Sequence, residues 1–117
     1  GSIVADYQAF ERIMNNLIDN AIKYSDKNSK ITVSTFNEAD EYIKILVEDS
    51  GEGISPEDKD HIFSRFYRTA SARATDNQGS GLGLAIVKHL VNSLNGEVGV
   101  QNSKTKGSVF WFTVPLA

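Results

Sequence analysis

The most informative segment of this sequence lies in its second half and reads Gln78-Gly79-Ser80-Gly81-Leu82-Gly83-Leu84-Ala85-Ile86-Val87. A small, polar run precedes it, and an apolar pattern of helical spacing follows it. The alternating glycines let the backbone approach a ligand, and the helix that opens after them begins with unpaired N–H donors and a positive dipole end. This combination favours an anion, most often a phosphate. Glycine-rich turns before helices also occur only to turn the chain, so the stretch alone does not identify a phosphate site.

The spacing of these glycines excludes two common phosphate motifs. They alternate at Gly79, Gly81 and Gly83. That spacing fits neither the Gly-x-Gly-x-x-Gly dinucleotide fingerprint nor a Walker loop, which needs a Gly-Lys pair.

Composition limits the classes of protein to which the chain can belong. Its 117 residues suit one domain, and 40% hydrophobic and 23% charged residues are typical of globular proteins. A net charge of −3 and the lack of a basic run predict no binding to nucleic acid. The absence of cysteine excludes disulfides, thiol nucleophiles and cysteine-based zinc sites. No apolar run reaches the roughly 20 residues of a membrane-spanning helix, so this domain is not expected to enter a membrane.

Outward from the glycines, apolar periodicity predicts helices alternating with pairs of strands. The expected elements are a strand stub at residues 3–5, a helix over 6–24, strands over 31–36 and 42–48, a helix from Ser55 to about Arg65, a mobile loop over 69–78, a helix from the glycines to a C-terminal cap at Gly96, and strands over 98–102 and 108–114. This order predicts a two-layer α/β sandwich with one mixed, largely antiparallel sheet. Gly1-Ser2 resembles a cloning remnant, and residues 1–117 are expected to be one domain cut from a longer protein.

The first helix carries a polar edge beside its apolar face. Asn16, Asn20 and Lys23 follow one another at intervals of about a turn, with Tyr24 at the end of the row. Taken alone, such a row is more often a solvated helix flank than a binding site.

Two further groups of polar residues are ambiguous in the same way. Asp49 ends the second strand in a turn with two glycines, where its carboxylate can accept a hydrogen bond from a ligand amine or from its own backbone. Arg65 and Arg68 can reach phosphate oxygens or simply cover the surface. His61 and His89 are expected to be solvated or satisfied rather than catalytic.

The order of these motifs resembles that of sensor histidine kinases. The N box corresponds to Asn16-Leu17-Ile18-Asp19-Asn20-Ala21-Ile22-Lys23-Tyr24, the G1 box to Asp49-Ser50-Gly51-Glu52-Gly53-Ile54, the F box to Ile62-Phe63-Ser64-Arg65-Phe66-Tyr67-Arg68, the G2 box to Gly79-Ser80-Gly81-Leu82-Gly83-Leu84, and the closing motif to Gly107-Ser108-Val109-Phe110. The chain is similar to the catalytic, ATP-binding domain of that family. The resemblance implies the Bergerat ATP-binding fold, with about three helices on one face of the sheet and a mobile ATP lid.

The resemblance also implies roles at the phosphate end of a nucleotide. Asn20 would be the main side-chain ligand of Mg²⁺, and Asn16 would support it from a turn away. Lys23 would pair with phosphate charge, and Tyr24 would lie against the nucleotide. The residues implied in catalysis are Asn16, Lys23, Arg65 and Arg68, the arginines as contacts of the γ-phosphate.

At the base end, Asp49 would accept the adenine amino group. Gly51 and Gly53 would let the backbone approach the base, Ile54 would wall the pocket, and Ser108 would reach the adenine side through water. The residues implied in nucleotide contact by the F and G2 boxes are Phe66, Gly79, Ser80, Gly81, Leu82, Gly83 and Leu84.

The implied activity is transfer of the γ-phosphoryl group of Mg-ATP to a histidine. Members of the wider gyrase–chaperone–kinase–mismatch-repair superfamily that hydrolyse ATP carry a glutamate base where this chain has Asn16, so hydrolysis is expected to be slow. No His-Glu-x-x-Arg-Thr-Pro-like motif is present, so the acceptor is expected on a separate helical domain of a homodimeric parent. The resemblance further implies a response regulator downstream and a cytoplasmic position in a bacterial membrane-anchored sensor.

Two alternatives remain open beside this interpretation. A serine kinase of the anti-sigma type shares the fold but usually keeps the glutamate base, which Asn16 replaces. A non-catalytic interaction domain would not need Asn20, Asp49 and the glycines of the G2 box. We also expect residues 69–83 to become ordered when a γ-phosphate is present.

Overall fold

A computed structural model describes most of the chain. The described residues are 7–24, 30–39, 41–51, 54–59, 61–64, 83–102 and 107–116. The expected strand stub at residues 3–5 and the expected lid at residues 69–78 lie outside these ranges.

The described strands form one antiparallel sheet. They are β1 (Thr32–Glu38), β2 (Tyr42–Glu48), β3 (Val98–Asn102) and β4 (Ser108–Pro115), in the spatial order β1-β2-β4-β3. β2 and β4 are the central pair, and each of the three pairings is antiparallel. A 3.0 Å hydrogen bond from Glu41 N to Glu38 O closes the connection between β1 and β2.

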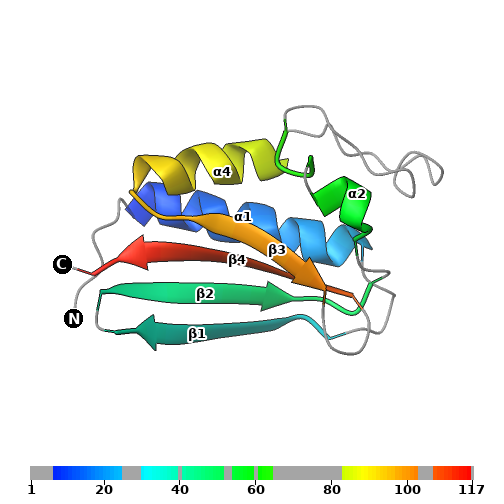
Figure 1. Ribbon diagram of the computed structural model, residues 1–117, viewed down its shortest axis with the longest axis horizontal. Coiled ribbons are helices and arrows are strands. Elements are labelled where there is room, and N and C mark those ends of the chain that lie inside the picture. Colours follow the sequence, from blue (N-terminus) through cyan, green and yellow to red (C-terminus); the bar gives the residue numbers. More distant parts are fainter. Residues whose placement is uncertain are drawn as a thin grey trace.

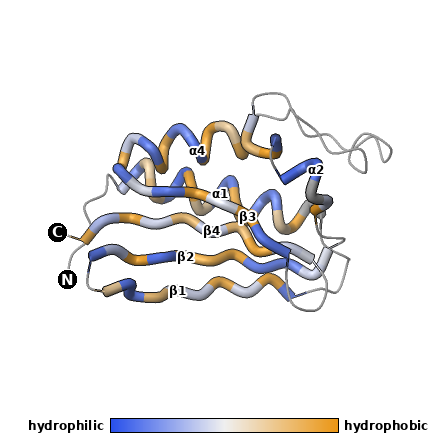
Figure 2. The backbone as a smooth tube through the Cα atoms, viewed as in Figure 1, coloured by the Kyte–Doolittle hydropathy of each residue, from blue (hydrophilic) through white to orange (hydrophobic). Residues whose placement is uncertain are grey.

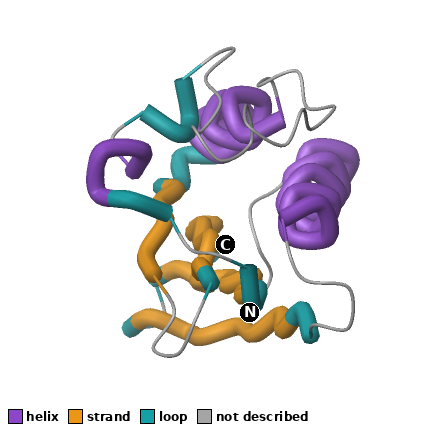
Figure 3. The backbone as a smooth tube through the Cα atoms, turned by 90° about the vertical axis from the view of Figure 1, so that its right-hand side faces the viewer, coloured by secondary structure: helices purple, strands orange, loops and turns teal. Residues whose placement is uncertain are grey.

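Helices cover one face of this sheet. The long helices are α1 (Tyr7–Tyr24) and α4 (Gly83–Ser93), and the short α2 (Pro56–Lys59) lies near the end where α4 begins (Figure 1). Viewed from that end, both long helices lie on the same side of the strands (Figure 3). The prediction of a two-layer α/β sandwich with helices on one face is therefore confirmed.

The core lies between the helices and the inner face of the sheet. Hydrophobic positions recur along α1, α4, β2 and β4 (Figure 2). The buried residues are Ile13, Leu17 and Ala21 from α1, Ile45 and Val47 from β2, Ile62 from the segment after α2, Val87 and Val91 from α4, and Phe110, Phe112 and Val114 from β4. Burying each large side chain contributes roughly 1.5–3 kcal/mol. The apolar face that the sequence predicted for the first helix is the face that α1 buries.

β4 is buried on both of its faces. Phe110 and Phe112 face the helices, whereas Val109 and Thr113 are buried on the opposite side. Trp111 covers that outer face, where a Cβ on its cross-strand neighbour Gly99 would overlap the indole. Lys44 Nζ lies 4.4 Å from the centre of the indole ring.

The helix that begins at Ser55 is shorter than expected. The Ser55 hydroxyl caps it by accepting from Asp58 N at 3.2 Å, but α2 ends at Lys59 rather than near Arg65. His61 N then bonds Asp58 O, three residues back, which tightens the backbone away from α-helical geometry. Phe63 contacts Phe110 edge-on, with 6.2 Å between ring centroids. Packing against the core therefore overrides local helix propensity here.

The C-terminus of α4 also differs from expectation. Asn95, not Gly96, adopts the left-handed conformation, with φ of 63°. Gly96 N bonds Val91 O at 3.0 Å and Asn95 N bonds Asn92 O at 3.0 Å, which together form a Schellman motif. Gly96 is needed for space instead, because a Cβ there would overlap the carbonyl of Thr113.

Candidate functional site

Several of the expected site residues that the structure describes lie toward one end of the sandwich. β2 and β3 end there, β4 and α4 begin there, and α1 runs toward the same end (Figure 1). Strand ends and a helix start supply backbone groups that the regular elements do not use internally. This end therefore has polar groups available for a ligand.

Asp49 is the buried centre of this end. It follows β2 directly, and only 3% of its surface is exposed. Its Oδ1 accepts from Gly51 N at 2.9 Å and from Ser108 N at 3.3 Å, and its Oδ2 accepts from the Ser108 hydroxyl at 2.9 Å. In addition, Asp49 N donates to Ser108 O at 2.9 Å. These bonds fix the carboxylate between the end of β2 and the start of β4.

These bonds leave a specific acceptor site on Asp49. An ionised carboxylate offers about four lone-pair sites, two on each oxygen. Within the described part of the chain, both sites of Oδ1 and one site of Oδ2 are used. The second site of Oδ2 can accept one N–H from a ligand, as an exocyclic amine would offer.

Gly107 makes this arrangement sterically possible. Its φ is +102°, a conformation that residues with a side chain rarely adopt, and a Cβ there would overlap the carbonyl of Asp49. The chain can therefore turn into β4 against the end of β2 only with glycine at this position.

The start of α4 faces a polar side chain of α1. Asn16 Nδ2 donates to Arg12 O at 2.9 Å, one turn back on its own helix. This bond leaves Asn16 Oδ1 on the side of α4, where it lies 3.4 Å from the position that a Cβ on Gly83 would occupy. Asn20 follows one turn along α1 and is half-buried. Asn16 thus lies beside the first turn of α4, with Asn20 one turn further along α1.

A second contact fastens the turn after β2. Ile54 N donates to Asn102 Oδ1 at 3.1 Å, which joins the end of that turn to the end of β3. Ile54 is half-buried and packs against the core cluster. No local pattern indicates a role for Asn102, because the contact joins residues 48 positions apart.

The structure brings together only part of the predicted site. Asp49, Gly51, Ile54 and Ser108 form one group, and Asn16, Gly83 and Leu84 lie around the start of α4, with Asn20 a turn away on α1. Lys23 and Tyr24 end α1, and their side chains are not described. The predicted site residues outside the described ranges are Gly53, Arg65, Phe66, Arg68, Gly79, Ser80, Gly81 and Leu82.

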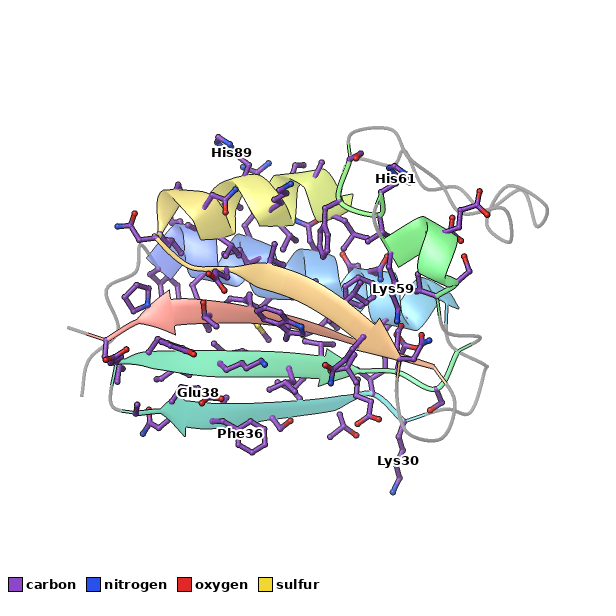
Figure 4. All side chains as sticks on the ribbon, viewed as in Figure 1. Lys30, Phe36, Glu38, Lys59, His61 and His89 are labelled. Atoms are coloured by element: carbon purple, nitrogen blue, oxygen red, sulfur yellow. The ribbon has the colours of Figure 1, made fainter. Side chains whose placement is uncertain are left out.

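Neither histidine belongs to this group of described residues. His89 is exposed and projects from α4 away from the sheet, and the exposed His61 follows α2 (Figure 4).

The described residues offer amide oxygens to a metal ion rather than a cluster of carboxylate, imidazole or thiolate ligands. Among the residues that the structure describes, no three His, Cys, Asp or Glu side chains stand close enough to hold a metal. Amide oxygens such as those of Asn16 and Asn20 are hard ligands of the type that Mg²⁺ takes when a substrate supplies most of the coordination. The residues therefore fit Mg²⁺ bound together with a phosphate ligand.

The fold and this site define a family. The chain belongs to the histidine kinase-, DNA gyrase B- and HSP90-like ATPases, whose family model matches residues 5–117. This finding confirms the family suggested by the order of the sequence motifs.

Within that family, the similarities are to sensor histidine kinases. The chain is 41% identical to the sensor protein CiaH of Streptococcus pneumoniae over 93% of its own length, and 38% identical to the sensor histidine kinase WalK of Bacillus subtilis over 94%. It spans only 24% of CiaH and 18% of WalK. None of the helices among the described residues is long and apolar enough to cross a membrane.

Solved structures give the same result. The mycobacterial sensor histidine kinase MprB superposes with a TM-score of 0.89 at 31% identity, covering 97% of this chain and 76% of that one. Full-length ShkA in complex with AMPPNP superposes with a TM-score of 0.83 at 32% identity, covering 98% of this chain and 23% of that one.

Proposed function

We propose that this chain binds Mg-ATP and transfers its γ-phosphoryl group to a histidine on a separate acceptor domain of a sensor histidine kinase. The observation that carries this proposal is the buried Asp49, whose Oδ2 retains one acceptor site beside three bonds that fix the carboxylate. A fixed acceptor of this kind pairs with the exocyclic amine of adenine and leaves the carbonyl of guanine unsatisfied.

The phosphate end of the site lies between α1 and the start of α4. The first turn of α4 presents unpaired N–H donors and a positive dipole end, which stabilise phosphate oxygens. Asn16 Oδ1 faces that turn across Gly83, which has no side chain to fill the space. A bound nucleotide would therefore run from Asp49 at the end of β2 to the start of α4.

Asn20 would hold Mg²⁺, with Asn16 supporting it and phosphate oxygens supplying other ligands. The ion would supply charge neutralisation of the phosphates. The protein's part in the transfer is to position the nucleotide, to stabilise charge and to exclude wrong bases. Lys23, Arg65 and Arg68 are proposed as the cationic contacts of the phosphates.

The proposed transfer favours a protein acceptor over water. The bond from the γ-phosphorus to the bridging oxygen breaks, ADP leaves, and a phosphorus–nitrogen bond forms with the imidazole of the acceptor. Asn16 has no basic side-chain group that could take a proton from water. ATP hydrolysis by this chain should therefore be slow.

The remaining parts of the proposal concern the parent protein. Its acceptor histidine would lie on a helical dimerisation domain, and a response regulator would take the phosphoryl group from that histidine. A cytoplasmic position beneath a membrane-anchored sensor rests on the resemblance to sensor kinases, and the bacterial relatives named as sensor proteins support it.

Two measurements test the proposal. Calorimetric titration with AMPPNP and Mg²⁺ should show binding to this chain, and GTP should bind much more weakly. With a matching acceptor-domain fragment and labelled ATP, label should appear on that fragment as acid-labile phosphate. Acid-stable phosphate would indicate a serine kinase instead, and no heat with any nucleotide would indicate a non-catalytic interaction domain.

A further inference from the structure

We propose that Asn102 is a positioning residue for the base end of the nucleotide site. The inference rests on the proposed function, because it concerns the loop that would wall the adenine pocket. Asn102 is the last residue of β3 and lies outside every motif in which the family resemblance was recognised.

The loop after β2 is held by hydrogen bonds at both of its described ends. β4 lies between β2 and β3 in the sheet. The loop leaves β2 at Asp49 and returns to the sheet at Ile54, whose N–H bonds Asn102 Oδ1 at 3.1 Å on β3. Asn102 is the cross-strand neighbour of Ser108, which in turn holds Asp49. The described ends of the loop are therefore held on both sides of the start of β4.

The two hydrogen bonds that hold the loop differ in their exposure to solvent. On the β2 side, Gly51 N bonds the buried Asp49 carboxylate at 2.9 Å. On the β3 side, the described backbone of the loop is held by the Asn102 amide oxygen, at an exposed position. If the bond to Asn102 were lost, water could accept the hydrogen bond from Ile54 N instead, so the fold would lose little stability. The loop would then sample more positions over the adenine pocket.

This freedom should weaken binding of the base and leave the phosphate end unaffected. Loss of one neutral hydrogen bond in a preorganised site lowers affinity roughly threefold to tenfold. The loss should be equal for ADP and AMPPNP, since both present the same adenine to the loop. A defect at the phosphate end would change the ratio of the two affinities.

The experiment compares three variants of this chain with the wild type. Asn102→Leu keeps the approximate volume and removes the acceptor, Asn102→Asp keeps an acceptor oxygen, and Gln101→Leu is the control on the opposite face of β3. Calorimetry gives the Kd of ADP and of AMPPNP with Mg²⁺, and NMR gives the hydrogen-exchange protection of the Ile54 amide.

Asn102→Leu should raise both Kd values by the same factor and lower the protection of Ile54, with an unchanged melting temperature. Asn102→Asp and Gln101→Leu should behave like the wild type. The inference is overturned when Asn102→Leu leaves the Ile54 amide protected or leaves both affinities unchanged. Absence of nucleotide binding by the wild type would instead refute the proposed function, and the Ile54 amide alone would then show whether Asn102 holds the loop.

Discussion

At the scale of single residues, Asp49 has two tasks that the sequence did not separate. Its buried carboxylate accepts three described hydrogen bonds and also presents an acceptor toward the proposed adenine pocket. Replacement of Asp49 by alanine would therefore remove the structural hydrogen bonds and the proposed adenine contact at the same time. Asp49→Ala would strand buried donors of Gly51 and Ser108, at a cost of roughly 1–3 kcal/mol of stability.

Asp49→Asn should separate the tasks. The retained Oδ1 can still accept from Gly51 N and Ser108 N, and the new amide can donate to the Ser108 hydroxyl, so the melting temperature should fall little. That amide would oppose the amino group of adenine, and the Kd of AMPPNP should rise roughly tenfold or more. Calorimetry and thermal unfolding measure both effects.

The same variant should bind ITP relatively better than ATP, because the base of ITP carries a carbonyl where adenine has its amine. Equal ATP binding by wild type and Asp49→Asn would remove Asp49 as the base-selecting group.

At the scale of elements, α4 begins where α1 presents its amide side chains. The first residue of α4 is Gly83, and the nearest atom of the described structure to an added Cβ there is Asn16 Oδ1 at 3.4 Å, an ordinary contact. Packing among the described residues therefore does not demand glycine at this position. The proposed phosphate site does require glycine, because the ligand would occupy the space that a side chain at position 83 would fill.

Gly83→Ala should accordingly uncouple stability from binding. Alanine has the higher helix propensity, so unfolding stability should stay unchanged or rise by up to about 1 kcal/mol. The Kd of AMPPNP with Mg²⁺ should increase several-fold, as a methyl group fills the approach to the first turn of α4. Denaturant unfolding and titration check the two effects, and loss of stability without a change in Kd would mean that Gly83 serves packing alone.

The outer face of the sheet offers a second test at this scale. Trp111 is the only tryptophan, and its indole lies over Gly99 where a Cβ would overlap it. Gly99→Ala should displace the ring from β3 and from Lys44, at a cost of about 1 kcal/mol. Tryptophan emission should shift to longer wavelength, whereas Gln101→Ala on the same strand should leave the spectrum unchanged. An unshifted Gly99→Ala spectrum would contradict this packing.

At the scale of the whole molecule, the proposed site joins both layers of the sandwich. Asp49 and Ser108 come from the sheet, and Asn16 and Gly83 come from the helices. A nucleotide that contacts both layers would bind the folded chain only. Binding should therefore stabilise the whole domain against unfolding.

A saturating ligand should raise the melting temperature by several degrees, since a concentration of 100 times the Kd contributes about 2.7 kcal/mol. AMPPNP with Mg²⁺ should produce this shift in the wild type, as measured by differential scanning calorimetry. Asp49→Asn should show at most about half of this shift at the same concentration, since a tenfold higher Kd leaves about 1.4 kcal/mol of stabilisation. An equal shift in both proteins would indicate binding away from Asp49.

The fold class, the order of the described elements and the apolar face of α1 could all be predicted from the amino-acid sequence. These features follow from hydrophobic periodicity and from turn and cap residues, which are local along the chain. Tertiary structure decided where α2 ends, because Phe63 packs on Phe110 from a distant strand. Tertiary structure also explains the need for glycine at position 96, since a carbonyl of β4 occupies the space beside it. The bond between Asn102 and Ile54 and the double use of Asp49 depend equally on strands distant in sequence. Local patterns cannot specify such contacts, because only the folded sheet brings the partners together.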